Sequence, residues 1–86
     1  MHCIRDFRPD LRDAVDHLQV AGLVREAYSL AASLERAYPT SSEMLSDIGR
    51  TILRVERGLG TAVPADVEAA FQRALAEIRK IIPSLN

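Results

Sequence analysis

Apolar side chains recur every three or four residues along nearly the whole chain, and this spacing constrains the fold more than any other feature. It matches an amphipathic α-helix, whereas no window alternates apolar and polar residues as a half-buried strand does. At 86 residues, the chain has a length suited to one domain. The sequence therefore predicts a single all-α domain over residues 1–86.

Three interruptions divide the helical pattern. At about 100° per residue, the apolar stripe after Gly22 is rotated by roughly 150° from the stripe before it, so a helix break is expected there. Pro39 ends the second stripe, which runs to Tyr38, and a loop of residues 58–64 separates the last two helices. The sequence predicts helices near residues 10–21, 23–38, 40–57 and 64–82. These form a four-helix bundle of two helical hairpins, residues 10–39 and 40–83, after a loose segment of residues 1–9.

The expected ends of the last two helices have specific signals. Thr40 and Glu43 stand in the positions of a capping box, which predicts the start of the third helix. Gly58 and Gly60 are expected to end that helix, since glycine is favoured just past a helix end. Pro64 is well placed in the first turn of the fourth helix.

Composition and charge limit the possible functions. Eleven basic residues against twelve acidic ones leave a net charge of −1, which disfavours nucleic acid as a partner. Cys3 is the only cysteine, so neither an intramolecular disulfide nor a cysteine-based metal site is expected. The sequence contains no apolar run of signal-peptide or membrane-span length. We therefore expect a cytoplasmic protein that does not contact membranes.

Residues 20–39 resemble the second half of a tetratricopeptide repeat, with Gly22 at the interhelical turn, Ala27 at the helix crossing and Pro39 at the end. Gly49, one repeat length after Val15, stands at a first-helix position where that family keeps a small residue. A generic four-helix bundle would show the same apolar stripes and is the alternative. The resemblance implies a concave surface lined by the first helix of each hairpin. On this sequence the implied partner-binding residues are Arg12, Asp16, Gln19, Ser46, Arg50, Leu53 and Arg54.

Catalytic patterns are missing from the sequence. It has no phosphate-binding glycine loop, no nucleophile elbow, no paired carboxylates and no known metal-ligand spacing. We therefore expect a non-enzymatic protein–protein interaction or regulatory module that binds a protein partner and needs no cofactor or metal.

Two other functions stay open. His17, on the first predicted helix, resembles the exposed phosphoacceptor histidine of histidine phosphotransfer domains, which are helical bundles. Gln19 or Val20, however, takes the place of the family's phosphate-holding lysine. The third helix resembles the end of the recognition helix in lambda-repressor-like helix-turn-helix proteins, which suggests a small DNA-binding regulator. Its Gly49 stands only three residues before Ile52, too close for the turn of that motif.

Arginines recur on one face of the third helix, at Arg50, Arg54 and Arg57. Such a stripe is expected either to be solvated or to recognise carboxylates, because a guanidinium pairs with a carboxylate through two parallel hydrogen bonds.

The fourth helix carries more apolar residues than one neighbouring hairpin can cover. Two hairpins are also fewer than the three or so that a repeat stack needs for stability. The sequence therefore predicts a homodimer. The residues expected to mediate self-association are Phe71, Ile78, Ile81 and Ile82.

Overall fold

The computed structural model describes residues 7–85, which form four α-helices and one short 3-10 helix. The helices are α1 (Arg8–Val20), α2 (Val24–Glu35), α3 (Ser41–Leu59) and α4 (Ala65–Ile81), with the 3-10 helix η1 (Gly60–Ala62) following α3. Between residues 7 and 85 there is no strand, so the predicted all-α, four-helix fold is confirmed. None of these helices is both long and apolar enough to cross a membrane.

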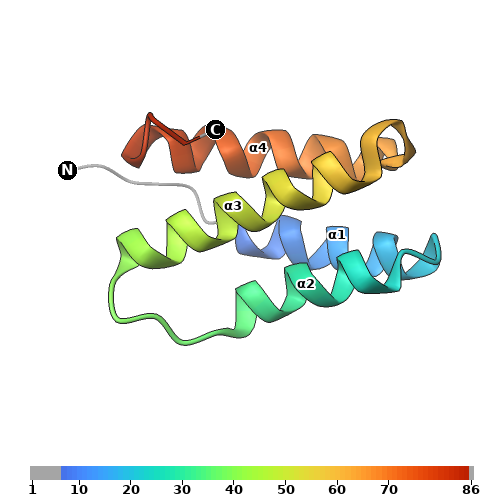
Figure 1. Ribbon diagram of the computed structural model, residues 1–86, viewed down its shortest axis with the longest axis horizontal. Helices are drawn as coiled ribbons and strands as arrows, with labels where there is room; N and C mark the ends of the chain where they lie inside the picture. The colour runs from blue at the N-terminus through green and yellow to red at the C-terminus, as the bar shows by residue number, and fades with distance from the viewer. Residues whose placement is uncertain (1–6, 86) are drawn as a thin grey trace.

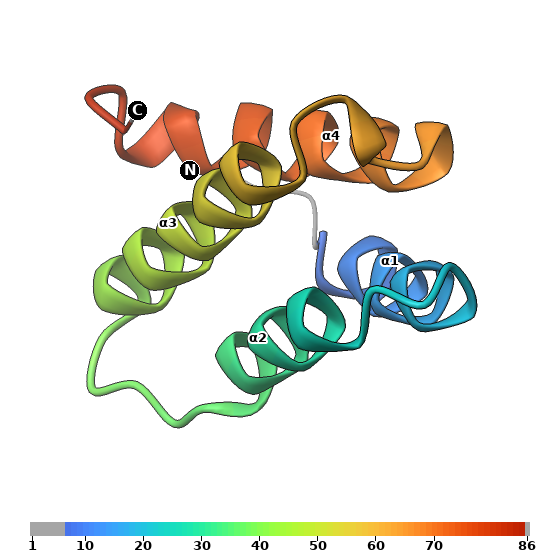
Figure 2. The same ribbon diagram turned by 45° about the vertical axis from the view of Figure 1, so that its right-hand side comes forward.

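The four helices form a closed ring. Consecutive helices run in opposite directions, and the last returns to the first (Figure 1). α1 packs against α2 and α4, and α3 packs against the same two helices. The turned view shows α1 and α3 at opposite corners of the ring (Figure 2). The two hairpins, α1–α2 and α3–α4, therefore close into one bundle.

The core is built from the stripes that the sequence predicts. The four stripe residues of α1 are all buried, and each of the other helices adds its own set. Phe7 before α1 and Leu85 after α4 are buried as well, and neither belongs to a predicted stripe. The remaining buried apolar residues are Leu11, Ala14, Val15, Leu18, Ala27, Leu30, Leu45, Ile48, Ile52, Val55, Val67, Ala70, Phe71, Ala74, Leu75 and Ile78.

The break at Gly22 is confirmed. Gly22 has a positive φ of 82°, a conformation that costs glycine little because it has no Cβ. Its backbone N–H donates to the carbonyl of Gln19 at 3.0 Å, and the N–H of Leu23 donates to that of Leu18 at 2.8 Å. This pair of bonds is the Schellman motif, which satisfies the last carbonyls of a helix and turns the chain away.

Two of the expected boundaries need correction. α2 ends at Glu35, not near Tyr38, because the ring of Pro39 would clash with the carbonyl four residues earlier if the helix continued. α3 continues through Gly58 to Leu59 and ends at Gly60, whose φ is 57°. Gly58 is thus a helical residue and not the stop that its residue type suggested.

The starts of the last two helices agree more closely with expectation. The side chain of Thr40 accepts a hydrogen bond from the backbone N–H of Glu43 at 3.2 Å, as the capping box predicts. Pro64 is the residue immediately before the first helical position of α4, one place earlier than the first turn.

The segment after α4 folds back onto the bundle. Leu85 is buried, and its side chain occupies the space beside Gly49 of α3, where a larger residue would have its Cβ. The Nε of Arg79 donates to the carbonyl of Leu85 at 3.3 Å, and the N–H of Leu85 donates to the carbonyl of Ile82 at 3.2 Å. The small residue that resembles a repeat signal therefore accommodates the chain's own C-terminal segment.

Candidate interaction surface

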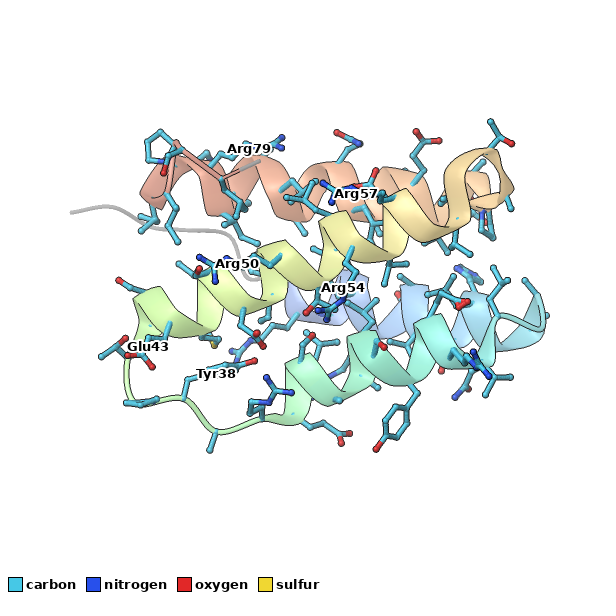
Figure 3. The ribbon with its side chains drawn as sticks, in the orientation of Figure 1. Tyr38, Glu43, Arg50, Arg54, Arg57 and Arg79 are labelled. Carbon is cyan, nitrogen blue, oxygen red and sulfur yellow. The ribbon has the colours of Figure 1, made fainter. Side chains whose placement is uncertain are left out.

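Three arginines project from the outer face of α3. Arg50, Arg54 and Arg57 are exposed, and their spacing of four and three residues places them on one side of the helix. Figure 3 shows their guanidinium groups along α3, with that of Arg54 toward α2 and that of Arg57 toward α4. Within residues 7–85, none of the three forms an ion pair or a side-chain hydrogen bond. We refer to Arg50, Arg54 and Arg57 as the arginine face.

Arg79 of α4 adds positive charge to the same side of the molecule (Figure 3). It lies near Glu56, a half-buried carboxyl on α3. Burial raises the pKa of Glu56, the nearby carboxylate of Glu68 raises it further, and Arg79 acts in the opposite direction. Glu56 therefore keeps its proton to a higher pH than an exposed glutamate does.

A side-chain network ties the α2–α3 loop to α3 beside the arginine face. Arg36 pairs with the carboxylate of Asp47 at 3.0 Å. The hydroxyl of Tyr38 has a single proton to donate, and both the same carboxylate and the backbone carbonyl of Ser33, 3.0 Å away, lie within hydrogen-bond range as acceptors. Burial raises the pKa of Tyr38 to about 12. Asp47 contributes to this rise both as a hydrogen-bond acceptor and as a nearby negative charge. The network lines a shallow hollow of about 300 Å³, which Glu43, Ser46 and Arg50 complete.

The predicted partner-binding residues fall on two separate surfaces. Arg12, Asp16 and Gln19 border a groove of about 410 Å³ between α1 and α2. Ser46 and Arg50 line the hollow beside the α2–α3 loop, and Leu53 and Arg54 follow along α3. The structure brings together the members of each group. It does not bring the two groups together, because α1 and α3 lie at opposite corners of the ring.

Two of the four residues predicted to mediate self-association are internal. Phe71 and Ile78 are completely buried in the core formed by residues 7–85, so they cannot contribute to a surface of the folded chain. The sequence predicts that α4 is a terminal helix covered by one neighbouring hairpin. In the structure α4 packs on both α1 and α3. Ile81 remains 40% exposed, and Ile82 is half-buried.

His17 is exposed near the end of α1. It borders a groove between α1 and α4 together with Asp10, Asp13, Asp66 and Arg73. Arg73 is engaged by Asp10 at 3.4 Å. In residues 7–85 no cluster of histidine, cysteine and carboxylate side chains is suited to hold a metal ion.

Two features of the surface were not predicted from the sequence. The Arg36–Tyr38–Asp47 network depends on a loop conformation that no local pattern encodes. Two large apolar residues on the outer face of α2, Val24 and Tyr28, are 63% and 74% exposed. A signal for the second feature was available, because both residues lie off the apolar stripe of the second helix.

Comparisons with protein-family models, curated protein sequences and solved structures give no match to this chain. The resemblance to tetratricopeptide repeats therefore stays a prediction that rests on Gly22, Ala27, Pro39 and Gly49 alone.

Proposed function

We propose that this chain is a small non-catalytic interaction module that binds an acidic segment of a protein partner through the arginine face of α3. The observation that supports this most directly is the alignment of three exposed arginines without an ion pair in the described part of the chain. A guanidinium offers carboxylates a planar pair of donors. Arg50 and Arg57 are about 10 Å apart along α3, at 1.5 Å per residue, which suits carboxylates two turns apart on a helix.

The half-buried Leu53 supports the same proposal. It lies on α3 between Arg50 and Arg54 and packs at the edge of the core. An apolar side chain bordered by arginines allows a partner to combine charge pairing with the exclusion of water, a combination common in protein interfaces. The predicted partner-binding residues Arg50, Leu53 and Arg54 thus belong to one continuous strip.

Nucleic acid fits this surface less well than protein. The chain carries a net charge of −1, and nucleic-acid affinity comes largely from neutralising phosphates. α3 also packs lengthwise between α2 and α4, whereas a recognition helix must present its first turns to the major groove. The first turn of α3 contains Glu43, which would repel the DNA backbone.

A phosphotransfer role for His17 is the second candidate that the fold allows, since that chemistry uses an exposed histidine on a four-helix bundle. Asp10, Asp13 and Asp66 border the groove in which His17 lies. Their negative charge disfavours a phosphorylated imidazole, and the one cation there, Arg73, is paired with Asp10. We therefore rank protein binding above phosphotransfer.

The test uses a defined probe. The ¹⁵N-labelled protein is titrated with a helical peptide that carries Glu at positions i, i+4 and i+7, and with the same peptide carrying Gln there. We expect the Glu peptide to shift the amide resonances of α3 around the arginine face, with an affinity that falls as salt rises. The Gln peptide should leave them unchanged.

Single charge reversals locate the binding surface. Arg54→Glu is expected to lower the affinity for the Glu peptide at least about tenfold, which corresponds to about 1.4 kcal/mol of binding free energy. Arg12→Glu, an exposed arginine on α1, serves as the matched control and should have no effect. Tighter binding of duplex DNA than of the Glu peptide would refute the proposal. Acid-labile phosphate on His17 after incubation with a phosphorylated response regulator would favour the second candidate.

A further inference from the structure

The outer face of α2 carries large exposed apolar residues in its first half and the exposed Glu35 at its end, and no other helix of residues 7–85 covers it. Val24 and Tyr28 are one helical turn apart and are 63% and 74% exposed, and Val20, just before the α1–α2 turn, is 89% exposed. Ala31 continues the same face one turn later. Exposed apolar residues that adjoin one another typically mark an interaction site, and tyrosine is among the residues that contribute most to interface affinity.

A groove of about 410 Å³ runs beside this ridge. Its lining combines the apolar residues Val15 of α1 and Ala31 and Leu34 of α2 with the polar residues Arg12, Asp16, Gln19 and Glu35. The ridge and the groove therefore belong to the same α1–α2 layer. A two-fold symmetric interface requires this arrangement, since each surface must be complementary to itself.

The spacing along α2 sets a register for such an interface. Ala31 lies three residues after Tyr28 and three residues before Leu34. If two α2 helices pack antiparallel about an axis at Ala31, Tyr28 of each copy comes level with Leu34 of the other, about 4.5 Å along the helix from the axis. Alanine at the axis lets the two helices approach closely, and each Tyr28 ring reaches the groove of the other copy.

We propose that two copies of this chain associate through the outer face of α2, antiparallel about Ala31, with Tyr28 of each copy seated in the α1–α2 groove of the other.

Charge complementarity supports a second copy as the occupant. Arg25 stands six residues before Ala31 and Glu35 four residues after it, so antiparallel packing brings the two within about 3 Å of each other along the helix axis. Both side chains are exposed, and neither has an ion pair within residues 7–85. Each interface would therefore gain two Arg25–Glu35 pairs at its rim. This surface is separate from the arginine face, so the inference does not rest on the proposed function.

Sedimentation equilibrium over about a hundredfold range of concentration tests the association. The mass is expected to rise from the monomer value of 9.5 kDa toward twice that value. Tyr28→Glu should raise the dissociation constant at least about tenfold and should retain the far-UV circular dichroism spectrum, because the side chain is exposed. Ile81→Glu, the same change at an exposed apolar residue of α4, is the matched control and should leave the dissociation constant unchanged.

Disulfide formation tests the register. In a Cys3→Ser background the chain has no other thiol, so Ala31→Cys should oxidise to a covalent dimer while Val24→Cys should not. The proposal is overturned by a wild-type chain that stays monomeric throughout, by a dimer that Ile81→Glu disrupts and Tyr28→Glu does not, or by cross-linking at position 24 in preference to 31. Arg54→Glu should leave the association of the two copies intact. This variant therefore distinguishes a failure of the dimer proposal from a failure of the proposed peptide binding.

Discussion

At the scale of single residues, Tyr38 shows how one side chain can fix a loop. Its hydroxyl joins Asp47 of α3 to the carbonyl of Ser33 at the end of α2. These contacts hold the α2–α3 connection against the bundle where Pro39 has stopped the helix. The neutral hydroxyl is the form that donates, so ionisation would place two negative charges side by side.

Tyr38→Phe is expected to lower the free energy of unfolding by about 1–2 kcal/mol, because a partly buried hydrogen bond to a charged acceptor is lost. The pKa of Tyr38 is raised to about 12 in the folded protein from 10.0. The stabilisation is therefore complete below about pH 10 and is lost as pH rises through 12. The free energies of unfolding of the wild type and of Tyr38→Phe, measured in urea, should therefore converge as pH rises between these two values. A constant difference between the two across this range would contradict the assignment.

Gly49 is a residue whose requirement comes from the tertiary structure. A Cβ at this position would collide with a δ-methyl of Leu85. Gly49→Ala is expected to lower stability by less than about 1 kcal/mol, because overpacking is partly relieved by a shift of the end of the Leu85 side chain and alanine favours the helix by about 1 kcal/mol. In a Leu85→Ala background the same change should become neutral or stabilising, as urea unfolding of the double-mutant cycle would show. Equal effects in both backgrounds would exclude the contact as the cause.

At the scale of helices, the glycines near the end of α3 have opposite roles. Gly58 lies within the helix with open space around it, and Gly60 has a positive φ with no nearby obstruction. The first position accepts a side chain, whereas the second is strained by any residue that has a Cβ. Their order explains why α3 is longer than its sequence signals suggest.

Gly58→Ala is therefore expected to raise the free energy of unfolding by about 0.5 kcal/mol. Gly60→Ala should lower it by about 1 kcal/mol, because a non-glycine residue is disfavoured in the left-handed region. Thermal or urea unfolding of both variants measures these two changes in the free energy of unfolding. If Gly58→Ala destabilised the protein and Gly60→Ala did not, α3 would end at Gly58 as its residue type indicates.

At the scale of the whole molecule, the contact between α1 and α4 decides how the hairpins depend on each other. The ion pair between Asp10 and Arg73 spans the same two helices. Each hairpin buries its apolar side chains against the other along two helix pairs, α1–α4 and α2–α3. The buried apolar residues of all four helices form one hydrophobic cluster that the two hairpins share.

We expect the two hairpins to unfold in one cooperative transition. Native-state hydrogen exchange should give α2 and α3 the same highest free energy of opening. A fragment of residues 1–62, which lacks α4, should lose most of its helical circular dichroism signal, because α1 then loses one of its two neighbours. Retention of a folded first hairpin in that fragment would instead favour an array of independent repeats.

The sequence by itself determined the helical class, the breaks at Gly22 and near Pro39, the cap at Thr40 and most of the core. Each of these follows from residues adjacent in the chain, whose spacing and backbone preferences act locally. Only the tertiary structure decided that α4 covers α1, that Leu85 fills the space at Gly49, and that Phe71 and Ile78 are internal. These outcomes depend on how whole helices pack against one another. Within residues 7–85 the same packing leaves the arginine face and Tyr28 exposed and without partners, because the other helices do not cover these surfaces.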